Sequence, residues 1–123
     1  MPLVCERSAV LDIFAQAARR QWVIPAFCAE NPTTVEAVLA AAQEHAQYLH
    51  EPQLPVILAI TNQYTHRRQS VYYTHTQRWD IGLKRFMSDV RILTDIPSPF
   101  SQLKVMILLD HTQWDADAEL LNW

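Results

Sequence analysis

An aspartate and a histidine, Asp110 and His111, stand side by side where a long apolar run ends. An imidazole can bind a divalent metal, and an adjacent carboxylate can transfer protons or orient the metal ligand. The preceding run, Leu103–Leu109, predicts a strand buried on both faces, as in a parallel sheet. Charged groups are rarely buried without partners, so the pair should lie where this strand emerges. The residues alone also allow a simpler interpretation, a carboxylate that caps a following helix beside an exposed histidine.

A second group of polar side chains lies in residues 62–79, which we predict to be a long basic and aromatic loop. It contains tyrosines, histidines and arginines but no acid before Asp80. Its arginines could bind phosphate, its tyrosines could stack on sugar rings, and the mixture also resembles a small nucleic-acid patch. The alternative is a solvated loop with a few half-buried tyrosines. The arginines concerned are Arg67, Arg68 and Arg78.

Composition limits the classes of protein that need to be considered. The 123 residues are 50% apolar and 19% charged, which is typical of one soluble globular domain. The net charge of −3 gives no overall attraction to nucleic acid or to an anionic membrane, and we expect neither partner. No apolar stretch is long enough for a membrane span, and the N-terminus lacks the pattern of a signal peptide. Two cysteines, Cys5 and Cys28, suit a reducing, cytoplasmic location.

The elements that must position Asp110 and His111 alternate along the chain. Apolar periodicity, helix-start signals and prolines predict one N-terminal helix followed by three βα units, and therefore an α/β fold with a parallel sheet. The second unit carries an insertion, the loop 62–79. The predicted helices are Ser8–Arg20, Pro32–Tyr48, Trp79–Thr94 and a last one that begins at Asp115 and runs to Trp123; the predicted strands are Trp22–Phe27, Pro55–Ile60 and Leu103–Leu109. Ser8 is the predicted cap of the first helix, and Asn31 followed by Pro32 predicts the N-cap and the start of the second.

Three βα units make an incomplete sheet. Both sheet edges would be open, and the strands are too apolar to be left exposed. Eight such units close a barrel. We therefore expect residues 1–123 to form a single but incomplete domain, the N-terminal part of something larger or a piece that needs a partner.

Three segments together resemble the class II, zinc-dependent fructose-bisphosphate aldolase family. They occur in the order that the family shows, and the resemblance extends from Val23 to about Leu121. The segments are Ile24–Phe27 with Asn31–Ala42, then Pro55–Asn62, and then Val105–His111.

The resemblance implies a partial TIM (β/α)8 barrel whose third strand ends in the catalytic pair. His111 would be a ligand of the catalytic Zn2+, and Asp110 would handle the proton of the hydroxyl group next to the bond that is cleaved. Zinc would polarise the carbonyl of a ketose phosphate and stabilise the enediolate. Thr61, with Asn62 beside it, takes the place of a substrate-contacting serine, and Cys28 takes that of a substrate-binding asparagine. From the residues alone, Cys28 is a reactive thiol or a small packed side chain.

The chain also departs from the family. Thr112 and the dipeptide Gln63-Tyr64 stand where members usually have glycines. One histidine cannot hold a catalytic zinc, which needs about three protein ligands, and the other two would lie beyond Trp123.

The expected function is thus an aldolase-like carbon–carbon lyase for a phosphorylated ketose of the fructose- or tagatose-bisphosphate type. We expect the isolated chain to be inactive and the full-length protein to form a homo-oligomer, as the family does. The alternatives are a non-catalytic barrel fragment that serves as a structural or interaction subunit, and a nucleic-acid-binding α/β domain.

Overall fold

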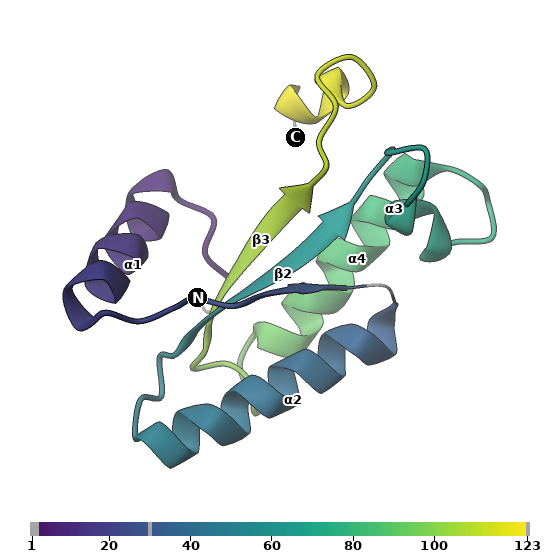
Figure 1. Ribbon diagram of the computed structural model, residues 1–123. Helices are drawn as coiled ribbons and strands as arrows, with labels where there is room; N and C mark the ends of the chain where they lie inside the picture. Colours follow the sequence, from purple (N-terminus) through teal and green to yellow (C-terminus); the bar gives the residue numbers. More distant parts are fainter. Residues whose placement is uncertain (1–2, 30, 123) are drawn as a thin grey trace.

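The computed structural model of the protein describes residues 3–29 and 31–122 (Figure 1). The three strands and the first three helices expected from the sequence are present, although several boundaries differ. In chain order the elements are α1 (Arg7–Arg20), β1 (Ala26–Cys28), α2 (Pro32–Leu49), β2 (Pro55–Thr61), α3 (Gln69–Tyr72), α4 (Trp79–Thr94), β3 (Lys104–Asp110) and the 3-10 turn η1 (Ala118–Asn122).

The three strands form one parallel sheet in the order β1-β2-β3. The parallel α/β architecture predicted from the sequence is therefore confirmed. The register brings Thr61, the last residue of β2, opposite Asp110, the last residue of β3. The shorter β1 ends at Cys28, which pairs with Ala59. The polar residues that follow β2 and β3 consequently meet at the carboxyl end of the sheet.

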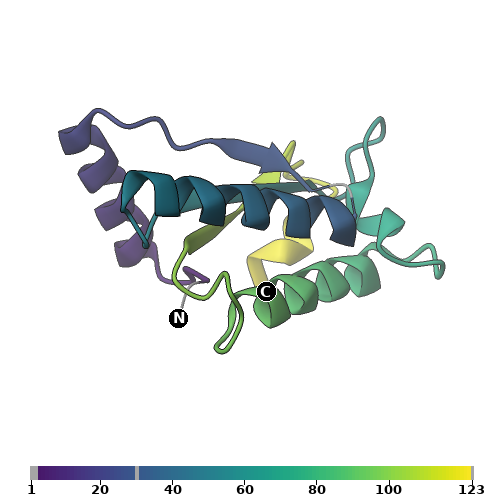
Figure 2. The same ribbon diagram turned by 90° about the horizontal axis from the view of Figure 1, so that it is seen from below.

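One face of the sheet carries the core. Side chains in a strand alternate between faces, and alternate residues of β2, namely Val56, Leu58 and Ile60, pack with apolar residues of α2 and α4. These two helices also contact each other and lie on the same side of the sheet (Figures 1 and 2). The core residues from the helices are Val35, Leu39 and Ala46 of α2 and Leu83, Phe86 and Val90 of α4.

The opposite face is covered less completely. Leu108, in the middle of β3, is 43% exposed. The helix α1 lies at the amino ends of the strands, where Ile13 and Ala17 line a small cavity together with Pro55 and Lys104, the first residues of β2 and β3. The rest of this face has no helix over it within the described residues.

Helix ends show how a chain with a single glycine turns. Asn31 caps α2, as predicted, because its side chain accepts a hydrogen bond of 2.9 Å from the Thr34 N–H. The helices α1 and α2 end at Gln21 and His50, which adopt the left-handed conformation usually taken by glycine. The prediction that Ser8 caps the first helix is wrong, since α1 begins one residue earlier and its N-cap position holds Glu6.

Three other predictions differ from the structure. The first strand covers Ala26–Cys28 and not Trp22–Phe27, because Pro25 has no N–H to donate to a ladder. The loop 62–79 contains the short helix α3, whose residues Gln69–Val71 are buried. The last predicted helix is only the 3-10 turn η1, and Trp123, its expected end, lies outside the described residues.

The single glycine lies where α3 packs against α4. A Cβ atom placed on Gly82 would come within 1.6 Å of the carbonyl oxygen of Ser70. Only a residue without a side chain allows the two helices to approach this closely. Gly82 therefore fixes how the insertion in the second βα unit folds back onto the domain.

Candidate functional site

The carboxyl end of β3 positions Asp110 and His111. The backbone leaves the strand in a left-handed conformation at His111 (φ 50°), which brings the imidazole back toward the preceding carboxylate. The His111 Nδ1 atom lies 3.0 Å from Oδ2 of Asp110, and the two side chains are 48% and 34% exposed. A carboxylate against Nδ1 favours a proton on that nitrogen and leaves Nε2 to accept a proton or a metal. The pair is accessible, and neither residue caps a helix.

A tyrosine from the neighbouring loop lies against this imidazole. The Tyr64 and His111 rings are stacked, with centroids 4.9 Å apart and an interplanar angle of 13°. His66 meets the same tyrosine edge-on, at 5.4 Å and 71°. A metal binds an imidazole nitrogen in the plane of the ring, so stacking on the ring face does not block coordination. The sequence indicates tyrosines in this loop, but nothing in their spacing predicts that one of them contacts His111.

Thr61 lies in register with Asp110 but is fully buried. The N–H of Ile57 donates to Pro25 just before β1, and the N–H of Thr61, four residues later, faces the same side beyond the end of that short strand. There it donates to Oε1 of Gln69 over 2.8 Å. Gln69 thus replaces a missing strand residue, a role that no sequence pattern indicated.

Asn62 is also buried, and its side chain is paired with Asp117. Its Nδ2 atom donates to Oδ1 of Asp117 over 2.9 Å. The Asp117 carboxylate is 3% exposed and accepts a further bond of 2.9 Å from the Gln113 N–H. Sequence reasoning missed Asp117, because it fell inside an expected helix. The repeated acids Asp115 and Asp117 after a strand end were the available signal.

Cys28 lies farther from the carboxyl end of the sheet than the other candidate site residues. Its partner in the register is Ala59, two residues before Thr61, and its side chain is partly buried. No contact found among the described residues connects it to Asp110 or His111. The structure therefore brings Thr61, Asp110, His111 and Tyr64 together at the carboxyl end of the sheet. Cys28 lies two residues before this end in the strand register.

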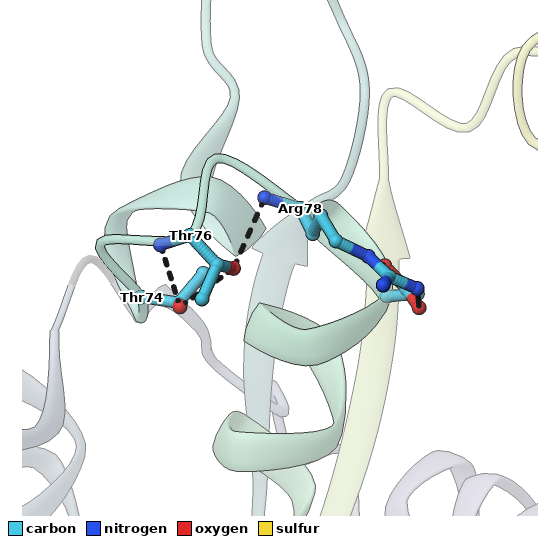
Figure 3. A network of polar contacts seen from close by, with 4 residues as sticks. Thr74, Thr76 and Arg78 are labelled. Atoms are coloured by element: carbon cyan, nitrogen blue, oxygen red, sulfur yellow. Dashed lines mark hydrogen bonds and ion pairs between the residues drawn. The ribbon is translucent and has the colours of Figure 1, made fainter.

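The basic residues of the loop 62–79 are partly committed to structure. Arg78 forms two bonds to Asp80 at the start of α4, of 3.1 and 2.7 Å. Its backbone N–H donates to Thr76, whose own N–H donates to Thr74 (Figure 3). The hydrogen bonds from Arg78 hold the pKa of the Asp80 carboxyl below its usual range. The Arg78 guanidinium is therefore already paired with Asp80 at the start of α4, which makes it less available to bind a phosphate.

The described residues do not provide a complete metal site. No group of three His, Cys, Asp or Glu side chains in residues 3–29 and 31–122 is arranged to hold an ion. A catalytic zinc needs about three protein ligands, so His111 by itself does not fit a resident zinc. Any such ion would need ligands from outside these residues.

Comparisons with known proteins leave this geometry to be interpreted on its own. No protein-family model, curated protein or solved structure matches the chain. Among the described residues, no helix combines the length and the apolar character needed to cross a membrane.

Proposed function

We propose that this chain is the N-terminal part of a class II aldolase-like enzyme that cleaves or forms a carbon–carbon bond in a phosphorylated ketose. The observation that carries the proposal is the contact between Asp110 and His111 at the end of a parallel strand, next to Thr61 on the neighbouring strand. The carboxyl ends of parallel strands are where α/β enzymes bind ligands and carry out chemistry.

Asp110 would carry the proton transfer. In cleavage its carboxylate takes the proton from the hydroxyl group on one of the two carbons that share the scissile bond. That carbon becomes an aldehyde, and the bonding electron pair passes to the neighbouring ketose carbon, which is later protonated. Asp110 suits this role because its side chain is 34% exposed and can reach a substrate.

His111 would supply one ligand of the zinc that the aldolase resemblance implies. Its contact with Asp110 orients the ring, and stacking on Tyr64 restricts its rotation. No group of three His, Cys, Asp or Glu side chains among the described residues is arranged to hold an ion. The remaining ligands would have to come from other parts of the complete enzyme.

The architecture supports a barrel origin. A (β/α)8 barrel needs parallel strands in sequential order with the helices on one face, and β1, β2 and β3 with α2 and α4 have this arrangement. The partly open face with Leu108 would then be directed toward the barrel interior. The two free cysteines, Cys5 and Cys28, support a cytoplasmic location.

The proposal is tested first on the isolated 123-residue chain. We expect weak zinc binding that His111→Ala removes and that the control His50→Ala leaves unchanged. We expect no cleavage of fructose 1,6-bisphosphate. Calorimetry measures the binding, and a coupled assay measures the cleavage. Stoichiometric zinc together with turnover would overturn the conclusion that the site is incomplete.

A non-catalytic interaction subunit is the second candidate function. It is favoured by the exposure of Leu108 and by β1, whose outer edge pairs with no strand among the described residues. Unpaired strand edges readily accept another chain. Light scattering distinguishes the two, since a stable oligomer of defined size supports a subunit and progressive aggregation supports an incomplete enzyme.

A further inference from the structure

An apolar groove lies between α2 and the segment that leads from α1 into β1 (Figures 1 and 2). Its volume of about 950 Å³ is within the range of small-molecule binding sites. Three large apolar residues in its lining are accessible to solvent, since Phe27 is 44%, Leu49 41% and Val23 91% exposed. None of the described residues that line it is Asp, Glu, Lys or Arg. The apolar groove therefore suits a hydrocarbon group of a ligand.

A smaller cavity with basic side chains adjoins the apolar groove. It has a volume of about 110 Å³ and lies between α1 and the amino ends of β2 and β3. Trp22 and Pro55 line both the groove and this cavity, so the two meet at these residues. The charged residues in its lining are two cations, Arg20 and Lys104, and one carboxylate, Glu51, which gives a net charge of +1. We call it the basic cavity.

The two cations of the basic cavity differ in how they are paired. Arg20 Nη1 lies 2.5 Å from Oε1 of Glu51, and its guanidinium lies over the Trp22 ring at 4.6 Å. Lys104 is partly buried, and its ammonium group forms no hydrogen bond or ion pair among the described residues. Because charges withdrawn from water are usually paired, Lys104 favours an anionic ligand group in this cavity.

We propose that the apolar groove and the basic cavity together bind an elongated apolar carboxylate, such as a medium-chain fatty acid. The carboxylate contacts the Lys104 ammonium group, and the hydrocarbon chain passes Trp22 and lies in the groove. The site is at the amino ends of the strands, whereas Asp110 and His111 follow the carboxyl end of β3. The inference therefore goes beyond the proposed function and does not depend on it.

Charge complementarity favours this ligand over other occupants of the groove. An apolar peptide or a second copy of the chain could fill the groove, but its apolar side chains would supply no anion to Lys104. A phosphate monoester would bring two negative charges to a cavity with a net charge of +1. A single carboxylate on a hydrocarbon chain matches both the charge of the basic cavity and the apolar lining of the groove.

The experiment is a calorimetric titration of sodium decanoate, kept below its micelle concentration, into the 123-residue chain and four variants. Lys104→Gln removes the unpaired cation, and Arg85→Gln, at an exposed residue of α4, is the matched control for net charge. Ala41→Phe places a ring in the groove. Ala40→Phe, at an exposed residue of α2 outside the groove lining, is the matched control for that change.

We expect saturable binding of one decanoate per chain. Lys104→Gln should weaken the binding by about tenfold or more, as the loss of one charge-assisted hydrogen bond implies. Ala41→Phe should weaken it as well, because the ring occupies the space of the hydrocarbon chain. Arg85→Gln and Ala40→Phe should match wild type. Decan-1-ol, which has the same chain without the charge, should bind about tenfold more weakly than decanoate. This comparison needs no variant, so it keeps the test valid if Lys104→Gln does not fold.

The proposal is overturned if decanoate does not bind the wild-type chain, if Lys104→Gln binds it as tightly as Arg85→Gln does, or if decanoate and decan-1-ol bind equally. Light scattering tests the other occupant. A dimer that Ala41→Phe dissociates and that binds no decanoate would assign the groove to a second copy and overturn the proposal. Neither zinc nor a sugar phosphate is present in these measurements, so their outcome is independent of the proposed carbon–carbon cleavage.

Discussion

Tyr64 lies face to face with His111, with ring centroids 4.9 Å apart, although the two residues follow different strands. This contact joins the loop after β2 to the end of β3 and limits the rotation of the imidazole. Asp110 holds the same ring from its Nδ1 side. The orientation of His111 is thus set by a stacking contact and a polar contact that act on different parts of the ring.

Replacing Tyr64 with leucine should allow the His111 imidazole to rotate more freely. We expect the His111 ring protons to shift downfield in NMR spectra, because the ring current of the tyrosine is lost. The free energy of unfolding should fall by about 0.5 to 1 kcal/mol, as is typical of a partly exposed aromatic pair. Tyr64→Phe keeps the stacking and should leave both quantities nearly unchanged. Equal spectra for the leucine and phenylalanine variants would contradict the stacking.

Gly82→Ala should be strongly destabilising. The new methyl group would meet the Ser70 carbonyl oxygen at 1.6 Å, and this atom belongs to the backbone, which cannot easily move away. We expect a loss of about 2 to 3 kcal/mol in urea unfolding, as in other overpacked sites. Ser88→Ala, on an exposed position of α4, is the control and should cost little. A Gly82 variant as stable as this control would show that α3 does not pack as closely as described.

Tyr73 should make the fold sensitive to alkaline pH. Burial, with a smaller contribution from Asp89, raises its pKa well above the ordinary value of 10.0. In the unfolded chain the phenol ionises near pH 10, whereas in the folded chain it stays neutral. The stability contributed by the neutral phenol is therefore present below pH 10 and is lost progressively as the pH rises above it.

Tyr73→Phe should remove this dependence. Its hydroxyl oxygen is buried without a partner among the described residues, so the substitution should also raise the free energy of unfolding at pH 7 by about 1 kcal/mol. Tyr72→Phe, at a residue that is 66% exposed, provides the comparison. Unfolding curves at pH 7 and above pH 10 measure both effects. A loss of stability at pH 7 would show that the Tyr73 hydroxyl has a partner after all.

Asp80 should make the stability of the fold sensitive to acidic pH, whereas Tyr73 makes it sensitive to alkaline pH. Because hydrogen bonds from Arg78 lower its pKa, the ion pair contributes stability above the ordinary carboxyl pKa, near 4, and this contribution is lost as the pH falls below that value. Asp80→Asn should therefore narrow the stability difference between pH 6 and pH 3. The effect should be small, since the pair is exposed to solvent. Asp12→Asn, on an exposed position of α1, is the control. It should leave the stability difference between pH 6 and pH 3 closer to that of wild type.

The strands and long helices could be predicted because their signals are local. Apolar runs, the Asn31-Pro32 helix start and the prolines before β3 indicate the elements directly. The position of Asp110 and His111 at a strand end followed from the same pattern. Contacts between distant residues have no such signal. The stacking of Tyr64 on His111 and the bond between Asn62 and Asp117 depend on how loops after different strands return over the sheet.

Short elements were also difficult to predict. The helix α3 has four residues and is held by Gly82 and by its burial, not by its own helical propensity. The 3-10 turn η1 replaces a longer expected helix, because Asp117 bonds to the Gln113 N–H and to Asn62 and ties the chain into a loop before it. In both cases tertiary contacts decide the local structure.

The central claim, that Asp110 and His111 form part of an aldolase-like site, is tested most directly in a complete barrel. The measurement is the rate of fructose 1,6-bisphosphate cleavage by a chimera in which residues 23–121 replace the equivalent segment of a class II aldolase. We predict zinc-dependent cleavage that Asp110→Asn lowers by about a hundredfold or more, as expected for loss of a general acid or base, and that Asp115→Asn leaves intact. A folded chimera without activity, or one whose activity survives Asp110→Asn, would contradict the claim.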